Sequence, residues 1–351
     1  MGRKGRMTSP RIRLLGFALL AAVTTLPAAG TERKDDFDSE AKSRTIWDFC
    51  QADSDKLTFE RQPEEPATFL RNRINASSTN PTCGRDAARE KLGPSVIEPL
   101  RKDCPVSSRS LGVQRSELRF KNRDDWQQSE VSHWYTISFK IAGAEGNKLP
   151  SCGSQRWVNA QWKYEDLGPN LSPFLAQRFD NGVLYITVED GFCRCVIAKG
   201  PGDPNTVLAN RYVASTSGKP GMALMDVKPI ECVNSRGDES ANECSPQNLK
   251  LTAYSQEALS SLPDPSKEWV RLTYLVKAGG PHESRFEVYA NGRFIVRAEH
   301  AYEEKVKFPN RVKFKFGHYR DKVWTSADML VDRICVSQDV TNCDASVEVP
   351  K

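Results

Sequence analysis

Three segments of the chain carry polar side chains at every second residue, the spacing that places side chains on one face of a β-strand. Most of these side chains are cations or amides, which donate hydrogen bonds. The three rows are Arg115, Glu117 and Arg119; Asn159, Gln161 and Lys163; and Lys315, Gly317 and Tyr319. Rows of donors on neighbouring strands would suit a polymer that carries carboxylates.

Each row also has an ordinary interpretation. An Arg fork held by a neighbouring Glu117 fits a carboxylate, but an exposed ion pair of the same residues contributes only ~0 to 1 kcal/mol. Polarity on one face is normal for any half-exposed strand. A glycine between Lys315 and Tyr319 would let a ligand approach the backbone. Three such rows together favour a polyanion-binding face.

The elements that must position these rows are strands. Apolar and polar residues alternate over 135–141, and Asn-Gly pairs at 181–182 and 291–292 predict two hairpins, 174–188 and 285–296. Further strands are predicted at 157–164, 269–276, 312–316 and 329–336. Long amphipathic helices are missing from the sequence. The pattern therefore predicts an all-β protein, a concanavalin A-like antiparallel β-sandwich or jelly roll.

Residues 31–109 have a different character from the rest of the chain. They are charged and broken by Pro and Asn, with one possible strand at 67–74 and weak helical spacing at 86–91. We expect an irregular, disulfide-stapled N-terminal region packed on the sandwich. The predicted organisation is a signal peptide at 1–30, this region at 31–109 and the jelly roll at 110–345.

The first thirty residues have the composition of a secretory signal. Five basic residues precede an apolar run at 14–26, and Ala28, Ala29 and Gly30 follow, so cleavage is expected near Gly30. Of 50 basic and 45 acidic residues, 45 and 45 then remain, which removes the electrostatic basis for nucleic-acid binding. We expect a secreted or periplasmic protein with no stable membrane span after cleavage.

All ten cysteines lie beyond this segment, which predicts disulfides in an oxidising compartment. A zinc site is the alternative, but Cys193 and Cys195 form the only tight pair and no His lies near them in sequence. No metal or other cofactor is predicted. Carboxylates such as Glu165 and Asp166 leave Ca²⁺ possible, although no EF-type loop supports it.

In this order, several segments resemble the jelly-roll polysaccharide lyases related to heparin lyase I and glucuronan lyase. The resemblance covers roughly residues 110–337 and is weak over 31–109. It rests on Gln114-Arg115-Ser116-Glu117-Leu118, His133 to Phe139, Ala160-Gln161-Trp162, Ser172-Pro173-Phe174, Trp269, Tyr289-Ala290-Asn291-Gly292 and Lys315-Phe316-Gly317-His318-Tyr319-Arg320.

The resemblance implies β-elimination beside a uronic acid, with loss of the C5 proton and of the sugar linked at C4. Donors must stabilise the anion that develops, and Arg115, Asn159 and Gln161 have the right chemistry. Tyr319 matches the family's catalytic tyrosine, and a nearby cation such as Lys315 favours its phenolate. The further residues that we expect to contact an acidic polysaccharide are Glu117, Arg119 and Arg320.

The chain departs from the family at one position. The family pattern is Gln-x-His, whereas this chain has Lys163 two residues after Gln161. An ammonium neutralises a carboxylate more readily than it acts as a base, unless its pKa is strongly lowered. His318 and His133 are alternative bases, although alternation places His318 on the apolar side of its strand.

Two functions therefore remain open. The first is a lyase with Tyr319, Lys315 and Lys163 as catalytic residues, and the second is a non-catalytic, lectin-like binder of acidic polysaccharides. A glycoside hydrolase is less consistent with the sequence, because no Glu-x-Asp-x-x-Glu arrangement is present. A serine hydrolase is disfavoured too, because there is no Gly-x-Ser-x-Gly motif.

Overall fold

The fold described here belongs to residues 31–351. A computed structural model describes most of this part of the chain. The described ranges are 32–52, 57–61, 68–74, 113–122, 127–143, 157–165, 173–180, 183–190, 193–201, 223–234, 246, 248–280, 283–301, 311–321 and 326–350.

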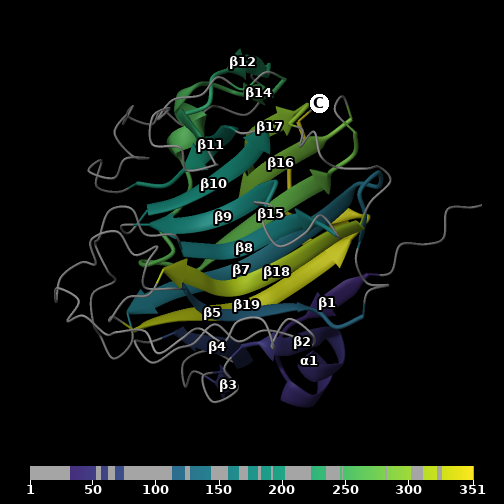
Figure 1. Ribbon diagram of the computed structural model, residues 1–351, viewed down its shortest axis with the longest axis vertical. Helices are drawn as coiled ribbons and strands as arrows, with labels where there is room; N and C mark the ends of the chain where they lie inside the picture. Colours follow the sequence, from purple (N-terminus) through teal and green to yellow (C-terminus); the bar gives the residue numbers. More distant parts are fainter. Residues whose placement is uncertain are drawn as a thin grey trace, which may run out of the picture. The chain divides into compact units, whose positions relative to one another are not determined.

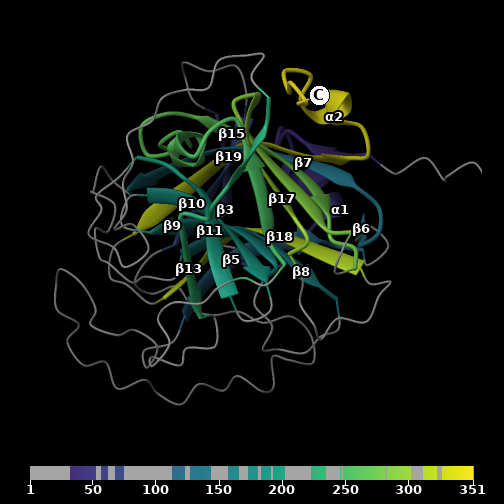
Figure 2. The ribbon, with the colours of Figure 1, turned by 90° about the horizontal axis from the view of Figure 1, so that it is seen from above.

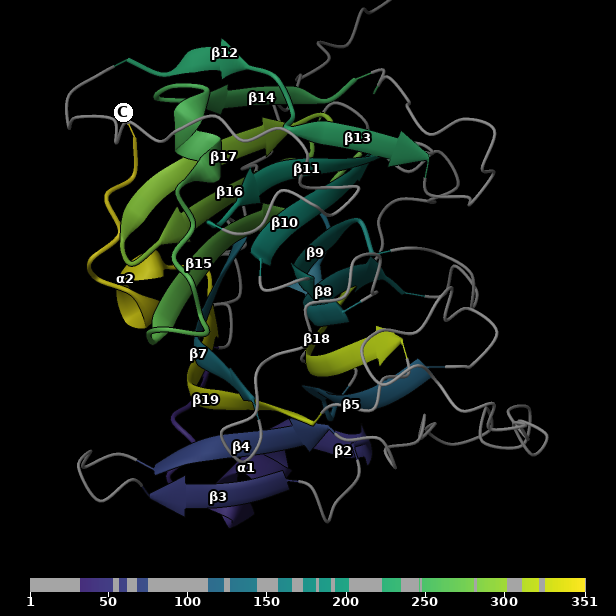
Figure 3. The ribbon, with the colours of Figure 1, turned by 90° about the vertical axis from the view of Figure 1, so that its left-hand side faces the viewer.

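Two antiparallel sheets build the described part, as Figure 3 shows edge-on. The first is ten-stranded. Its strands, in spatial order, are β12 (Met225–Val227), β14 (Lys250–Ala253), β17 (Arg293–Glu299), β16 (Arg285–Ala290), β15 (Val270–Lys277), β7 (His133–Gly143), β19 (Ala327–Ser337), β4 (Thr68–Ile74) and β3 (Leu57–Arg61), with β1 (Arg33–Asp35) beside β19.

The second sheet is nine-stranded (Figure 1), and the strands that hold the three donor rows belong to it. Its strands, in spatial order, are β13 (Glu231–Asn234), β11 (Cys193–Lys199), β10 (Val183–Asp190), β9 (Leu175–Asp180), β8 (Trp157–Tyr164), β18 (Arg311–Asp321), β5 (Val113–Phe120) and β2 (Trp47–Gln51), with β6 (Gln127–Gln128) beside β18. The helical elements are α1 (Glu40–Ile46), the 3-10 turn η6 (Glu257–Ser260) and α2 (Val340–Cys343). The predicted all-β sandwich is confirmed.

Aromatic side chains join the two sheets in the core. The ring centroid of Trp162 lies 5.1 Å from that of Phe314 within the nine-stranded sheet, and 5.5 and 4.7 Å from those of Tyr135 and Tyr274 on the opposite sheet. All four residues are at most 1% exposed. Large aromatic groups supply much of the apolar burial that stabilises a sandwich. The alternate residues of the same strands therefore face away from the core.

Both hairpins predicted from Asn-Gly pairs are present. Strands β9 and β10 pair in register across Asp180 and Val183, and β16 pairs with β17. Asn291 and Gly292 have φ values of 49° and 83°, the left-handed conformation that a tight hairpin turn requires. Residues 181–182 lie outside the described residues.

The N-terminal region, expected to be irregular, disulfide-stapled and packed on the sandwich, contributes strands to both sheets. Strand β1 pairs with β19, β2 pairs with β5, and β3 and β4 extend the ten-stranded sheet. The strand predicted at 67–74 is β4, whereas the helical pattern at 86–91 lies outside the described residues. The described part of 31–109 is therefore integral to the sandwich.

Disulfides are confirmed where the structure describes cysteines. Cys195 on β11 is bonded to its cross-strand partner Cys232 on β13, and Cys335 on β19 is bonded to Cys343 in α2. Cys193 is also disulfide-bonded, which removes the zinc interpretation of the Cys193 and Cys195 pair. The second bond holds α2 beside β7 and β19, as seen from above in Figure 2. No helix among the described residues is long and apolar enough to cross a membrane.

A buried polar chain connects the two sheets beneath β18. The Trp157 indole N–H donates to His318 Nδ1 at 3.0 Å, and His318 Nε2 donates to the Asn72 carbonyl of β4 at 2.9 Å. Because one ring nitrogen accepts and the other donates, the imidazole is neutral. Burial, followed by the charge of Arg320, lowers the pKa of His318 to about 3.

This histidine should make the protein sensitive to acid. An unfolded histidine binds a proton below its ordinary pKa of 6.5, whereas the folded one resists until about pH 3, so stability falls as the pH falls through this window. We expect a loss of about 3 kcal/mol from this group between pH 7 and pH 4. Urea unfolding at both pH values should show a smaller loss for His318→Gln. An equal loss in both proteins would contradict the assignment.

Candidate active site

The three donor rows lie on three neighbouring strands, β5, β18 and β8. Lys315 of β18 pairs with Arg119 of β5 and with Gln161 of β8 in register, and Tyr319 pairs with Arg115. The residues between them, such as Phe316, are buried in the core between the sheets. The row residues of β5 and β18 therefore share the outer face of the nine-stranded sheet, which we call the donor face.

Glu117 lies at the centre of the donor face. Its Oε1 accepts a short hydrogen bond from Gln161 Nε2, and its Oε2 lies 3.3 Å from Arg115 Nε and 3.9 Å from Lys315 Nζ. The residue is only 1% exposed. Its predicted role as a direct substrate contact is therefore corrected, because the carboxylate is buried, accepts a hydrogen bond from Gln161 and lies within ion-pair distance of two cations. Glu117 fixes the positions of groups that can contact a substrate.

Position 317 of β18, which pairs with Glu117 of β5, requires a glycine. Its φ is +121°, and a Cβ atom there would lie 2.2 Å from the Ser116 carbonyl oxygen and 3.0 Å from the Glu117 Cα. Any other residue would push β5 away from β18 and strain the backbone. The glycine therefore keeps the two strands close and leaves no side chain between Lys315 and Tyr319 on β18.

Lys315 has an altered affinity for protons. The residue is 8% exposed, and burial lowers its pKa to about 7. The Glu117 carboxylate opposes this effect, whereas the nearby cations Arg115, Lys313 and Lys163 add to it. At neutral pH a substantial share of Lys315 is therefore the neutral amine, which can accept a proton.

Tyr319 belongs to the same row as Lys315 on β18 and is separated from it by Gly317. The Arg115 guanidinium lies 4.6 Å from the centroid of the Tyr319 ring, which fixes the two side chains against each other. Tyr319 is half-buried, and its cross-strand neighbour on β8 is Val158. The cation that contacts the Tyr319 phenol ring is thus Arg115 of the neighbouring strand.

The row on β8 is interrupted by a bulge. The register shifts between Val158 and Ala160 against β9, and between Phe316 and Tyr319 against β18. Strict alternation placed Val158 in the core, but Trp157 occupies the core there instead. Asn159 sits at the bulge, 1% exposed, and neither end of its amide has a hydrogen-bond partner among the described residues. Gln161 and Lys163 keep their predicted face.

Two arginines that were predicted to bind substrate have other surroundings in the structure. Arg119 lies on the donor face, but it is bound to Asp48 of β2 through Nε and Nη2, at 3.0 and 2.9 Å. Arg320 is fully buried on the core side, with its guanidinium 5.2 Å from the Trp157 ring centroid. The role assigned to Arg320 is therefore wrong. Its position, one residue after Tyr319, already placed it on the opposite face.

Neither histidine can supply a base on the donor face. His318 is buried in the polar chain between the sheets. His133 lies on β7 of the other sheet, where burial lowers its pKa and its Nδ1 lies 3.1 Å from the Val131 carbonyl oxygen. Lys315 lies on the donor face, and its pKa of about 7 allows it to accept a proton near neutral pH.

Sequence reasoning missed four polar residues on the same face. The first of the four is Lys313, which pairs with Lys163. The other three lie on a line of cross-strand pairs that runs from Val158 across β9, β10 and β11. Its members are Arg178, Tyr185 and Lys199, each less than 9% exposed. Alternation within the 174–188 hairpin was the signal that could have found the first two.

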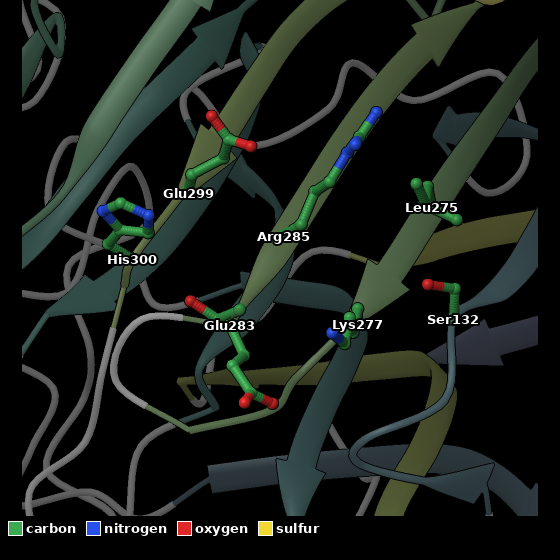
Figure 4. Close-up of a pocket in the computed structure, with 8 residues that line it drawn as sticks. Ser132, Leu275, Lys277, Glu283, Arg285, Glu299 and His300 are labelled. Carbon is green, nitrogen blue, oxygen red and sulfur yellow. The ribbon is translucent and has the colours of Figure 1, made fainter.

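The ten-stranded sheet carries a hollow. It has a volume of about 500 Å³ and lies beside β15, β16 and β17 (Figure 4). Glu283 and Glu299 line it together with Lys277 and Arg285. This balanced charge does not suit a polyanion. Among the described residues, no three His, Cys, Asp or Glu side chains are arranged to hold a metal ion.

The chain is similar to several proteins of known structure. An alginate lyase named A1-II′ is 15% identical with a TM-score of 0.43, covering 84% of this chain and 95% of its own. An endo-β-1,4-glucuronan lyase from Trichoderma reesei is 12% identical with a TM-score of 0.42, covering 87% and 99%. No curated protein matches the sequence. The polysaccharide lyase family matches residues 47–335, which include the donor face and most of the N-terminal region, and the chain therefore belongs to the polysaccharide lyase family.

Proposed function

We propose that the protein cleaves a uronic-acid-containing polysaccharide by β-elimination on the donor face. The observation that carries this proposal is the convergence of Arg115, Gln161, Lys315 and Tyr319 around Glu117 and Gly317. Family membership supports the reaction class. The alginate and glucuronan lyases named above support a uronate as the sugar at the cut.

The first requirement of the reaction is to neutralise the uronate carboxylate. The C5 proton is acidic only if the negative charge that spreads onto the carboxylate is stabilised. Arg115 offers a guanidinium that forms an ion pair with Glu117, and Gln161 offers an amide that is hydrogen-bonded to Glu117. Donors that are already in place can lower the barrier by several kcal/mol, about 3 for a single one.

The second requirement is a base and an acid. We assign the neutral amine of Lys315 as the base that removes the C5 proton, because its pKa is lowered to about 7. As the C5–H bond breaks, the C4–C5 double bond forms and the C4–O bond breaks. The Tyr319 hydroxyl gives its proton to the departing oxygen. Solvent then removes the proton from Lys315 and returns one to Tyr319.

A lectin-like binder is the second candidate, and Lys163 is the observation that favours it. A cation stands there in place of the family's His and retains charge for binding a polyanion. A binder would retain acidic polysaccharides without forming an unsaturated product. If Lys163→His creates activity that the parent protein lacks, the binder is the correct assignment.

We also propose that the protein is secreted or periplasmic. The basic and apolar N-terminus and the disulfides at Cys195 and Cys335 support export to an oxidising compartment. Mass spectrometry of the exported chain should locate its first residue near Thr31, and a chain that keeps residues 1–30 would argue against export.

We expect turnover to depend on the Tyr319 hydroxyl. Glucuronan, alginate and heparin should be tested for the ultraviolet absorbance of the unsaturated product, and Tyr319→Phe should lower kcat by roughly 10²- to 10⁴-fold on the polymer that is cleaved. Tyr254→Phe, directly after β14 of the other sheet, is the matched control and should keep the parent activity. Absence of product from all polymers with the parent protein would remove the lyase proposal.

Activity should rise with pH through the titration of Lys315. The amine must be neutral to act as a base, so kcat/KM should increase around pH 7, where its pKa lies. Lys315→Arg, which keeps the charge, should lose this rise together with most of the activity. A fall in activity across the same range would show that Lys315 acts as a cation.

Glu117→Gln should move this titration to lower pH. The Glu117 carboxylate raises the pKa of Lys315, so its removal favours the neutral amine. It also loosens Arg115 and Gln161, and we therefore expect kcat to fall at every pH. Glu299→Gln on the other sheet is the control for loss of one carboxylate. A midpoint that stays in place in Glu117→Gln would contradict the assignment of Lys315 as the titrating group.

A further inference from the structure

An asparagine of the ten-stranded sheet lies directly beneath the donor face. Asn72 belongs to β4, which lies opposite β5 across the core (Figure 3). Its Nδ2 donates to the backbone carbonyl of Ser116 on β5 at 2.8 Å, and its own carbonyl accepts the hydrogen bond from His318 on β18. All three residues are fully buried. One residue of the opposite sheet is therefore bonded to both strands that carry Arg115 and Tyr319.

The two residues that Asn72 contacts lie between the groups of the proposed site. Ser116 pairs with His318 across β5 and β18. The residues that flank this pair in the two strands belong to the donor face: Arg115, Glu117, Gly317 and Tyr319. The Ser116 carbonyl is part of the peptide group that leads into Glu117. Because the backbone of a strand sets where its alternate side chains lie, a bond to this carbonyl also places the Glu117 carboxylate.

The Asn72 amide fits closely beneath the pair of Gly317 and Glu117. A Cβ atom at position 317 would lie 2.8 Å from Asn72 Nδ2 and 3.0 Å from Glu117 Cα. The amide therefore touches the backbone at the point where β5 and β18 approach each other. Without this donor, the Ser116 carbonyl would have one hydrogen bond fewer to fix it, and β5 could shift relative to β18.

We propose that Asn72 is a positioning residue for the site on the donor face. Through the Ser116 carbonyl it sets the position of the Glu117 carboxylate, and with it the groups that this carboxylate contacts. The inference rests on the proposed function, in which those groups bind the uronate and remove its proton. Strand β4 of the N-terminal region thereby helps to form the site on the opposite sheet.

The titration of Lys315 reports where Glu117 lies. The charged groups around Lys315 are Glu117 and Arg115 on β5, Lys313 on its own strand and Lys163 on β8. Glu117 raises the pKa of Lys315, whereas the three cations lower it. A carboxylate that moves away from Lys315 therefore lowers the midpoint of its titration. Carbon NMR of isotope-labelled lysine side chains measures this midpoint without substrate, and Lys315→Arg identifies the signal.

For Asn72→Ala we expect the midpoint of Lys315 to fall by about half a pH unit or more, with a roughly tenfold lower kcat/KM. Asn72→Leu keeps the volume of the side chain and should give the same shift, which separates loss of the hydrogen bond from loss of packing. In the Glu117→Gln background, Asn72→Ala should leave the midpoint unchanged, because both substitutions act through one carboxylate.

Tyr274→Phe is the matched control. The Tyr274 hydroxyl donates to Gln177 Oε1 at 2.9 Å, a buried hydrogen bond that also joins the two sheets, from β15 to β9. This variant should lose stability without a change in the midpoint or in kcat/KM.

An unchanged midpoint in both Asn72 variants would overturn the positioning role. An equal shift in Tyr274→Phe, or a shift that persists in the Glu117→Gln background, would overturn it too. If the parent protein cleaves no polymer but the Asn72 variants show the shift, the lyase proposal fails and the role of Asn72 in placing Glu117 stands.

Discussion

Glu117 is buried between Arg115, Gln161 and Lys315, which belong to three neighbouring strands. A carboxylate in this position is stable only while its donors surround it, since an unpaired buried charge costs several kcal/mol. The same contacts hold the donors where they can reach a substrate. Gly317 completes the arrangement, because a side chain there would separate β5 from β18. The geometry of the donor face therefore depends on this one ionic centre.

The lowered pKa of Lys315 follows from the same arrangement. Burial and three neighbouring cations favour the neutral amine, and Glu117 moderates their effect. One lysine can thus work as a base near neutral pH, while Lys163, at the position of the family's His, remains on the outer face. Loss of that His does not by itself remove the means for β-elimination. In the proposed mechanism the proton acceptor is Lys315 of β18.

The alternation of polar and apolar residues along the chain predicted the strands and part of the donor face. Period two placed the β5 and β18 rows on one face, and the Asn-Gly pairs predicted both hairpins, because these are local properties of the backbone. The bulge at Asn159 could not be predicted, since it depends on pairing with two different strands at once. The burial of Glu117 and the pKa of Lys315 are likewise products of tertiary packing. Arg320 was misplaced for another reason, because family resemblance was followed against the strand parity.

The most direct test of the account is a crystal structure of Tyr319→Phe with an oligomer of glucuronate. The account predicts one carboxylate between Arg115 and Gln161, with the sugar ring over Gly317 and its C5 hydrogen directed at Lys315. An oligomer bound on the ten-stranded sheet, or on the donor face with its carboxylate away from Arg115, would contradict it.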